Sequence, residues 1–204
     1  MTRTMGDSTS LAAIPLTVNI AAVYDDGHLG VETEAQLAAR FPHDRYGHVF
    51  IDVTGAMPQG DVRDWENGDK GGSLQQWVID HNSRAGKKNA VVYANVSTIP
   101  EVRQLTGTQV LGTDYWLWVA TLDGTLFGPA QYPHVIANQV KGARLTGGDW
   151  DLSIVYDASF WLPVTPPPAP KPAPKYTREQ GQADIAAIAG ALGRLTVGVT
   201  ELPG

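Results

Sequence analysis

Short apolar segments that alternate with helix-like segments are the feature that most constrains the fold of this chain. The apolar segments are rich in β-branched or aromatic residues and have the length of strands; they cover residues 18–24, 49–53, 90–94, 115–120, 135–139 and 152–156. The helix-like segments between them cover residues 32–40, 73–84 and 99–105. Strands that alternate with helices predict an α/β fold with a mainly parallel sheet.

A cluster of prolines divides the chain. Residues 165–175 read TPPPAPKPAPK, a composition that favours an extended, semi-rigid spacer. We therefore predict four parts: an N-terminal arm (1–15), a main domain (16–162), a proline-rich linker (163–176) and a C-terminal helix with its tail (177–204).

The segment after the linker has the pattern of a helix that needs a partner. Thr177 and Gln180 fit a capping box, and Ile185, Ile188 and Leu192 recur at helical spacing. So narrow an apolar stripe cannot support an independent domain. The helix is expected to dock on another protein or to self-associate, with packing on the main domain as the alternative.

Composition excludes several functional classes. The chain of 204 residues has a net charge of −6, which argues against a nucleic-acid partner, and it contains no cysteine for disulfides, thiol nucleophiles or thiolate metal sites. No apolar run reaches the ~20 residues of a membrane span. The first residues carry no pattern of a signal peptide, so we expect synthesis in the cytoplasm, followed by incorporation into a particle or release on lysis.

Carboxylates recur where the predicted strands end. Asp25 and Asp26 follow the first strand, Asp151 stands at the last, and Asp64 and Glu66 flank Trp65. In an extended chain residues i and i+2 share a face, so Asp64 and Glu66 should point to the same side and Trp65 to the other. Crowded carboxylates can keep one acid protonated while another stays ionised, and a pair of them is the equipment of glycoside hydrolysis.

The order of motifs along the chain resembles the second half of glycoside hydrolase family 25, the lysozyme-type muramidases. A D-x-E strand, a strand ending in Tyr, a W-x-A strand, a strand ending in Gln and a closing acidic strand occur in sequence. The matching residues here are Asp64 and Glu66, Tyr93, Trp118 with Ala120, Gln139, and Asp151. The opening VYDDG and a following segment that contains FP resemble a family 25-like subgroup of actinobacteria and their phages.

The resemblance implies a (β/α) TIM-type barrel, shortened because the interval between Asp26 and Asp64 is brief. It implies cleavage of the β-1,4 bond after N-acetylmuramic acid, with Glu66 as proton donor and Asp64 orienting the substrate acetamido group. Asp25 or Asp26 takes the first-strand acidic position, or forms a turn before Gly27.

The same resemblance implies a set of substrate-binding residues. They are Tyr93, Trp116, Trp118, Gln139 and Asp151. Aromatic faces suit sugar rings, although the two tryptophans could equally fill the core and Gln139 could be an ordinary polar group at a strand end.

No cofactor or metal is expected. The histidines lack the spacing of metal ligands, and those at 43 and 48 are expected to be surface loop residues; the full set is His28, His43, His48, His81 and His134.

Two functions remain open at this point. The first is a phage-encoded, particle-attached peptidoglycan muramidase. The second is a virion structural component, such as a minor tail or capsid decoration protein, that binds cell-surface glycans through the barrel. In that case it anchors to other virion proteins, or to itself, through residues 177–204.

Overall fold

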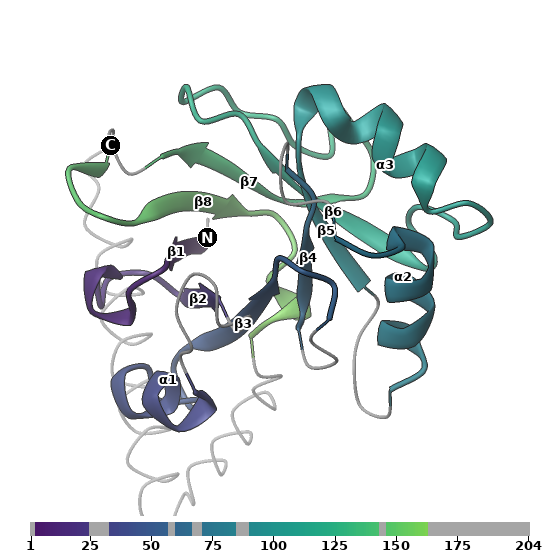
Figure 1. The fold of residues 1–204 in the computed structure, drawn as a ribbon. Coiled ribbons are helices and arrows are strands. Elements are labelled where there is room, and N and C mark those ends of the chain that lie inside the picture. Colours follow the sequence, from purple (N-terminus) through teal and green to yellow (C-terminus); the bar gives the residue numbers. More distant parts are fainter. Residues whose placement is uncertain are drawn as a thin grey trace, which may run out of the picture. The chain divides into compact units, whose positions relative to one another are not determined.

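A closed barrel of eight strands forms the centre of the protein (Figure 1). The computed structural model describes residues 3–24, 33–56, 60–66, 71–84, 90–142 and 146–162. The strands are β1 (Arg3–Ser8), β2 (Ile20–Tyr24), β3 (Gly47–Asp52), β4 (Val62–Asp64), β5 (Ala90–Asn95), β6 (Tyr115–Ala120), β7 (Val135–Lys141) and β8 (Asp151–Val155). They follow one another around the barrel in chain order, and β8 closes it by pairing with both β7 and β1.

The prediction of a barrel is confirmed, but the prediction of a (β/α) TIM type is wrong. Strands β1 to β7 run parallel to their neighbours, whereas β8 runs antiparallel to β7 and β1. The described connections contain three α-helices, α1 (Glu34–Arg40), α2 (Leu74–Asn82) and α3 (Ile99–Leu105). A TIM barrel has eight parallel strands, each followed by a helix. This barrel therefore has the eight strands of a TIM barrel, but only three α-helices occur in the connections that the structure describes.

The direction of β8 follows from the short connection that leads into it. Neighbouring parallel strands ordinarily need a long crossover, whereas an antiparallel pair can be joined directly. The chain passes from Lys141 to Asp151 through a brief connection and returns alongside β7. The Asp151 end of β8 consequently lies at the same end of the barrel as the carboxyl ends of the parallel strands.

The N-terminal segment is part of the barrel. Strand β1 lies within residues 1–15, which were predicted to form an arm, so the main domain begins earlier than expected. Met5 is the one large aliphatic side chain of this strand, and so the sequence shows little alternation. The local sequence does not favour a strand here, and hydrogen bonding to β2 on one side and to β8 on the other stabilises it.

Side chains fill the barrel and two outer layers. The interior cluster includes Met5, Val49, Val91, Trp118 and Val155. Figure 1 shows α2 and α3 beside one part of the wall, where an outer cluster unites residues of both helices with β5 and β6, and α1 beside another part, where it packs over β2.

Aromatic side chains close the end of the barrel where the parallel strands begin. Trp161, which follows β8, belongs to the interior cluster and meets Trp118 edge to face. The backbone of Trp161 approaches the start of β3 so closely that a Cβ on Gly47 would lie 2.6 Å from its carbonyl oxygen. The carboxyl groups of the interior lie at the opposite end, which we call the mouth.

Asp52, one of the carboxylates at strand ends, holds α2 against the barrel wall. It is fully buried; its Oδ2 accepts a hydrogen bond from Trp77 Nε1 at 2.8 Å, and its Oδ1 accepts one from the Gly55 N–H at 2.7 Å. This carboxylate is thus engaged in structural contacts outside the mouth.

The bond between Asp52 and Trp77 gives a first prediction. Trp77→Phe should lower the free energy of unfolding by about 1–3 kcal/mol more than Trp65→Phe, because it leaves a buried carboxylate oxygen without its donor. Trp65 is a matched control: it lies in the same cluster, and its indole nitrogen has no hydrogen-bond partner. Urea unfolding of both variants measures the difference, and equal losses would show that the bond contributes nothing.

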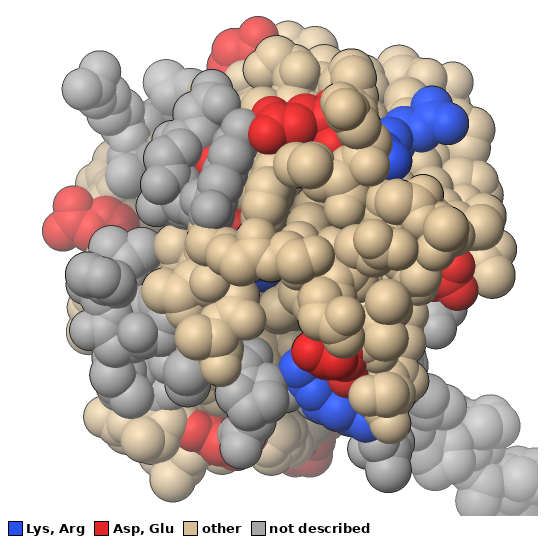
Figure 2. Space-filling view, turned by 45° about the vertical axis from the view of Figure 1, so that its right-hand side comes forward, with Lys and Arg blue, Asp and Glu red and all other residues tan. Residues whose placement is uncertain are grey.

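Charged side chains of the described residues are scattered over the face in Figure 2. Acidic groups stand apart from one another there, and Lys and Arg are sparse, whereas a nucleic-acid-binding face concentrates basic side chains. Among the described helices, none combines the length and the apolar character that crossing a membrane requires.

Contacts along the chain divide it into two units, residues 1–164 and 165–204. The predicted proline-rich linker and the predicted C-terminal helix lie outside the described residues.

Candidate functional site

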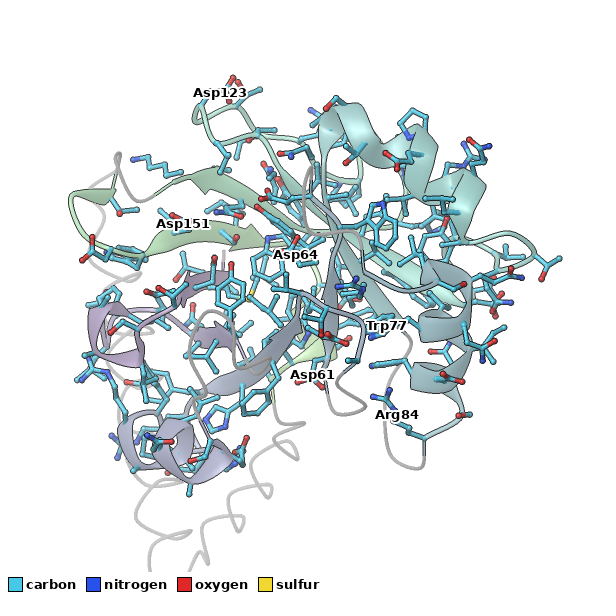
Figure 3. All side chains as sticks on the ribbon, viewed as in Figure 1. Asp61, Asp64, Trp77, Arg84, Asp123 and Asp151 are labelled. Carbon is cyan, nitrogen blue, oxygen red and sulfur yellow. The ribbon has the colours of Figure 1, made fainter. Side chains whose placement is uncertain are left out.

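Polar side chains from strands all around the barrel converge at the mouth. Every second residue of a strand faces the interior, and near the mouth these positions hold carboxyl, phenol and amide groups. They are Asp7, Tyr24, Asp64, Tyr93, Gln139 and Asp151, with Glu66 just beyond β4. Asp64 comes from β4 and Asp151 from β8, on separate parts of the wall (Figure 3).

Asp7 and Asp151 stand directly opposite each other in the antiparallel pair of β1 and β8. Side chains in such positions have Cβ atoms about 4.5–5.5 Å apart, and like charges there repel. Asp7 is 4% exposed, and its Oδ1 has no hydrogen-bond partner. Burial, with further contributions from Asp151, Asp64 and Glu66, raises the pKa of Asp7 well above its ordinary value. Asp7 therefore gives up its proton less readily than an ordinary aspartic acid does.

Two tyrosines, the buried Tyr93 and the partly buried Tyr24, lie beside these carboxylates. Burial and the nearby negative charges raise the pKa of Tyr24 and of Tyr93 well above the ordinary value for tyrosine. The Tyr93 side chain is hydrogen-bonded to Glu66, and a neutral phenol opposite a carboxylate is the donor. Tyr93 thus fixes the position of Glu66.

Asp64 and Glu66 lie on the same side of the chain, and Trp65 lies on the other. The Glu66 N–H donates to Asp64 Oδ1 at 3.2 Å, so the two acidic residues form one local unit. Trp65 packs in the outer cluster with Trp77, outside the barrel. Asp64 is buried and Glu66 is partly exposed, which leaves Glu66 as the member of the pair that a substrate can reach.

Gln139 and Asp151 form a second polar pair on the opposite wall. Gln139 Nε2 donates to Asp151 Oδ2 at 2.5 Å, while Gln139 Oε1 is buried and has no hydrogen-bond partner. A buried amide oxygen without a donor costs about 1–3 kcal/mol. The pair therefore offers a free acceptor at the mouth that a ligand hydroxyl or amide could satisfy.

A pocket of about 320 Å³ opens beside Asp7. Its lining comprises Asp7, Ser8, Thr9, Tyr24, Asp149, Trp150 and Asp151. The pocket combines carboxyl and hydroxyl groups with two aromatic residues, Tyr24 and Trp150, which is a lining suited to a polar ring such as a sugar.

Trp116 and Trp118 lie on β6 at different depths in the barrel, and Trp118 meets the ring of Tyr93 edge to face, with centroids 5.0 Å apart. Trp118 is 1% exposed, donates its indole N–H to Ser153 Oγ at 2.9 Å and packs within the barrel. Trp116 lies two residues nearer the start of β6 and packs against Phe160, at the end opposite the mouth. The prediction that these rings bind sugar stays a prediction, and the burial of Trp118 favours the alternative that it fills the core.

Asp7 is the acidic residue of the first barrel strand, β1. Asp25 and Asp26, which were predicted to take the first-strand acidic position, lie outside the described residues. Asp7 was missed because residues 1–15 were interpreted as an arm, whereas Tyr24 falls within the predicted strand 18–24 but was not selected as a site residue. The signal that could have found Asp7 is its spacing of two from Met5, which places both side chains on the interior face.

No family model, curated protein or solved structure matches this chain.

Proposed function

We propose that the barrel is a peptidoglycan muramidase, a glycoside hydrolase of the family 25-like kind. The observation that carries this proposal is the gathering of four carboxyl groups, Asp7, Asp64, Glu66 and Asp151, at one mouth, where burial and the neighbouring carboxylates raise the pKa of Asp7. A hydrolase of glycosidic bonds needs an acid that retains its proton next to carboxylates that remain ionised.

In the proposed reaction Glu66 donates the proton to the leaving oxygen. It is the partly exposed member of the pair with Asp64, and Tyr93 holds its carboxyl group in place. Asp64 is buried beside it and orients the acetamido group of the substrate. Asp7 is too enclosed to replace Glu66 as donor.

The substrate position follows from the pocket beside Asp7. Tyr24 and Trp150 line this pocket and supply aromatic rings for a sugar to pack against. The amide oxygen of Gln139 accepts from a sugar hydroxyl or from an acetamido N–H, which satisfies a buried acceptor. The C-terminal residues 177–204 attach the enzyme to other virion proteins or to a second copy, so that the protein reaches the cell wall on a particle or after lysis.

The chemistry of the products tests this function. Incubation of the purified full chain with peptidoglycan should release fragments whose new reducing ends are N-acetylmuramic acid, as identified by borohydride reduction and mass spectrometry. New ends at N-acetylglucosamine would assign a different glycosidase. Retention of the glycan without cleavage would support a binding component of a virion and would refute the enzyme.

A further inference from the structure

A second cluster of ligand-type side chains lies outside the barrel mouth, next to α1. Glu34, His43 and His48 each place one potential ligand atom within 4.8 Å of the others. Glu34 Oε1 lies 2.6 Å from His43 Nε2 and 2.8 Å from His48 Nδ1. The three residues come from α1, from the connection after it and from β3, so only the fold brings them together.

The hydrogen bond on the far side of His48 determines which nitrogen carries its proton. His48 Nε2 lies 2.5 Å from the carbonyl oxygen of Phe41, and a carbonyl can only accept, so Nε2 bears the hydrogen. In the neutral ring, Nδ1 then presents a lone pair to the Glu34 carboxylate. Two lone pairs at 2.8 Å need a cation between them, either an additional proton or a metal ion.

We infer that Glu34, His43 and His48 bind a divalent transition-metal ion of the zinc type. Two imidazoles and one carboxylate are a ligand set of zinc sites, and water completes the coordination. A metal-binding histidine usually donates its other N–H to a backbone carbonyl or a carboxylate, as His48 does to Phe41.

One of the three ligand side chains, His48, is fixed in position, and the other two can move. Bond lengths of about 2.0–2.2 Å place tetrahedral ligands roughly 3.3 Å apart, so the present contacts must widen by about half an ångström. The His48 side chain is 6% exposed and is fixed by Phe41, whereas those of Glu34 and His43 are 50% and 63% exposed and have room to shift. The rings of His43 and His48 are already close together, with centroids 3.9 Å apart and planes inclined at 38°.

Local structure holds Glu34 in position. Thr33 caps α1 in a reciprocal capping box with Gln36, which fixes Glu34 as the first residue of the helix. His48 lies on β3 between Gly47 and the interior residue Val49, and it faces outward toward α1. A bound ion would therefore fasten α1 to the barrel wall, in a role that is independent of the proposed hydrolysis.

Zinc titration of the metal-stripped full chain, free of any polyhistidine tag, tests the inference. Calorimetry at neutral pH should show one Zn²⁺ per chain, with protons released as the metal replaces them. His43→Ala and Glu34→Gln should each weaken binding by at least about tenfold, which is the loss seen even for partners outside the ligand set. Zn²⁺ should also raise the melting temperature of the wild type but not that of His43→Ala.

Asp44→Asn is the matched control. Asp44 is an exposed carboxylate in the same connection, beside Arg45 and outside the ligand set, so this variant should bind Zn²⁺ as the wild type does. Absence of uptake by the wild type would identify the cluster as a proton-bridged ion network. Equal affinity of the wild type and His43→Ala would likewise overturn the site.

Discussion

Glu66→Gln is expected to lower the rate of peptidoglycan hydrolysis by about 10²–10⁴-fold, the contribution of a positioned general acid. Glutamine keeps the shape of the side chain and can still meet the Tyr93 hydroxyl, but it has no acidic proton to transfer. Release of reducing ends from soluble peptidoglycan fragments measures the rate.

Asp80→Asn serves as the control for this experiment. Asp80 is an exposed carboxylate on α2 that accepts from Gln76, far from any role at the mouth, so its variant should keep full activity. Circular dichroism should show that both variants are folded. A Glu66→Gln enzyme with more than about a tenth of the wild-type rate would remove Glu66 from the role of proton donor.

Asp7→Asn is expected to stabilise the protein at neutral pH by about 1–3 kcal/mol. Asparagine removes a carboxyl group that faces Asp151 across the β1–β8 pair, and its amide can donate to the remaining carboxylate. Chemical denaturation at several pH values measures the gain. A loss of stability at neutral pH would mean that Asp7 is held as a stabilising carboxylate.

The gain should depend on pH in a defined direction. The folded-state pKa of Asp7 is raised well above its ordinary value of 3.8. Below pH 3.8 the folded and unfolded chains both hold the proton, so Asp7 favours neither state. As the pH rises through 3.8, the unfolded chain releases the proton first, and the folded state loses stability until the raised pKa is passed. The asparagine variant lacks this loss, so its advantage over the wild type should grow across that window.

Strand positions were predictable wherever the barrel wall is made of apolar runs. Residues 90–94 and 115–120 became β5 and β6 because both faces of these strands are buried, and so nearly every side chain is apolar. Strand β1 has the opposite character, because it ends in Gly6, Asp7 and Ser8. Strand β1 forms because it pairs with β2 and with β8, which lies at the far end of the domain. A local sequence pattern cannot predict such pairing.

Some site residues were likewise predictable from the local sequence, and others were not. The shared face of Asp64 and Glu66 follows from the period of two, and the structure places both at the mouth, with Trp65 outside. Trp118 is buried because the barrel closes around it and Trp161 packs against it. Neither contact can be read from the local sequence, so the sequence could not distinguish a core role for Trp118 from a substrate-binding one. The cluster of Glu34, His43 and His48 was missed because its spacing along the chain fits no metal motif.

The pairing of β1 with β8 also sets the order of events when the protein is made. Strands β2 to β7 each find a partner among the residues synthesised immediately before them, whereas β1 gains its second neighbour only when Asp151–Val155 has left the ribosome. Until then the nascent sheet has two open edges, and open edges recruit strands from other chains. Barrel closure joins the most distant parts of the domain, so it bears the largest loop-closure entropy and is expected to be the slow, final step of folding.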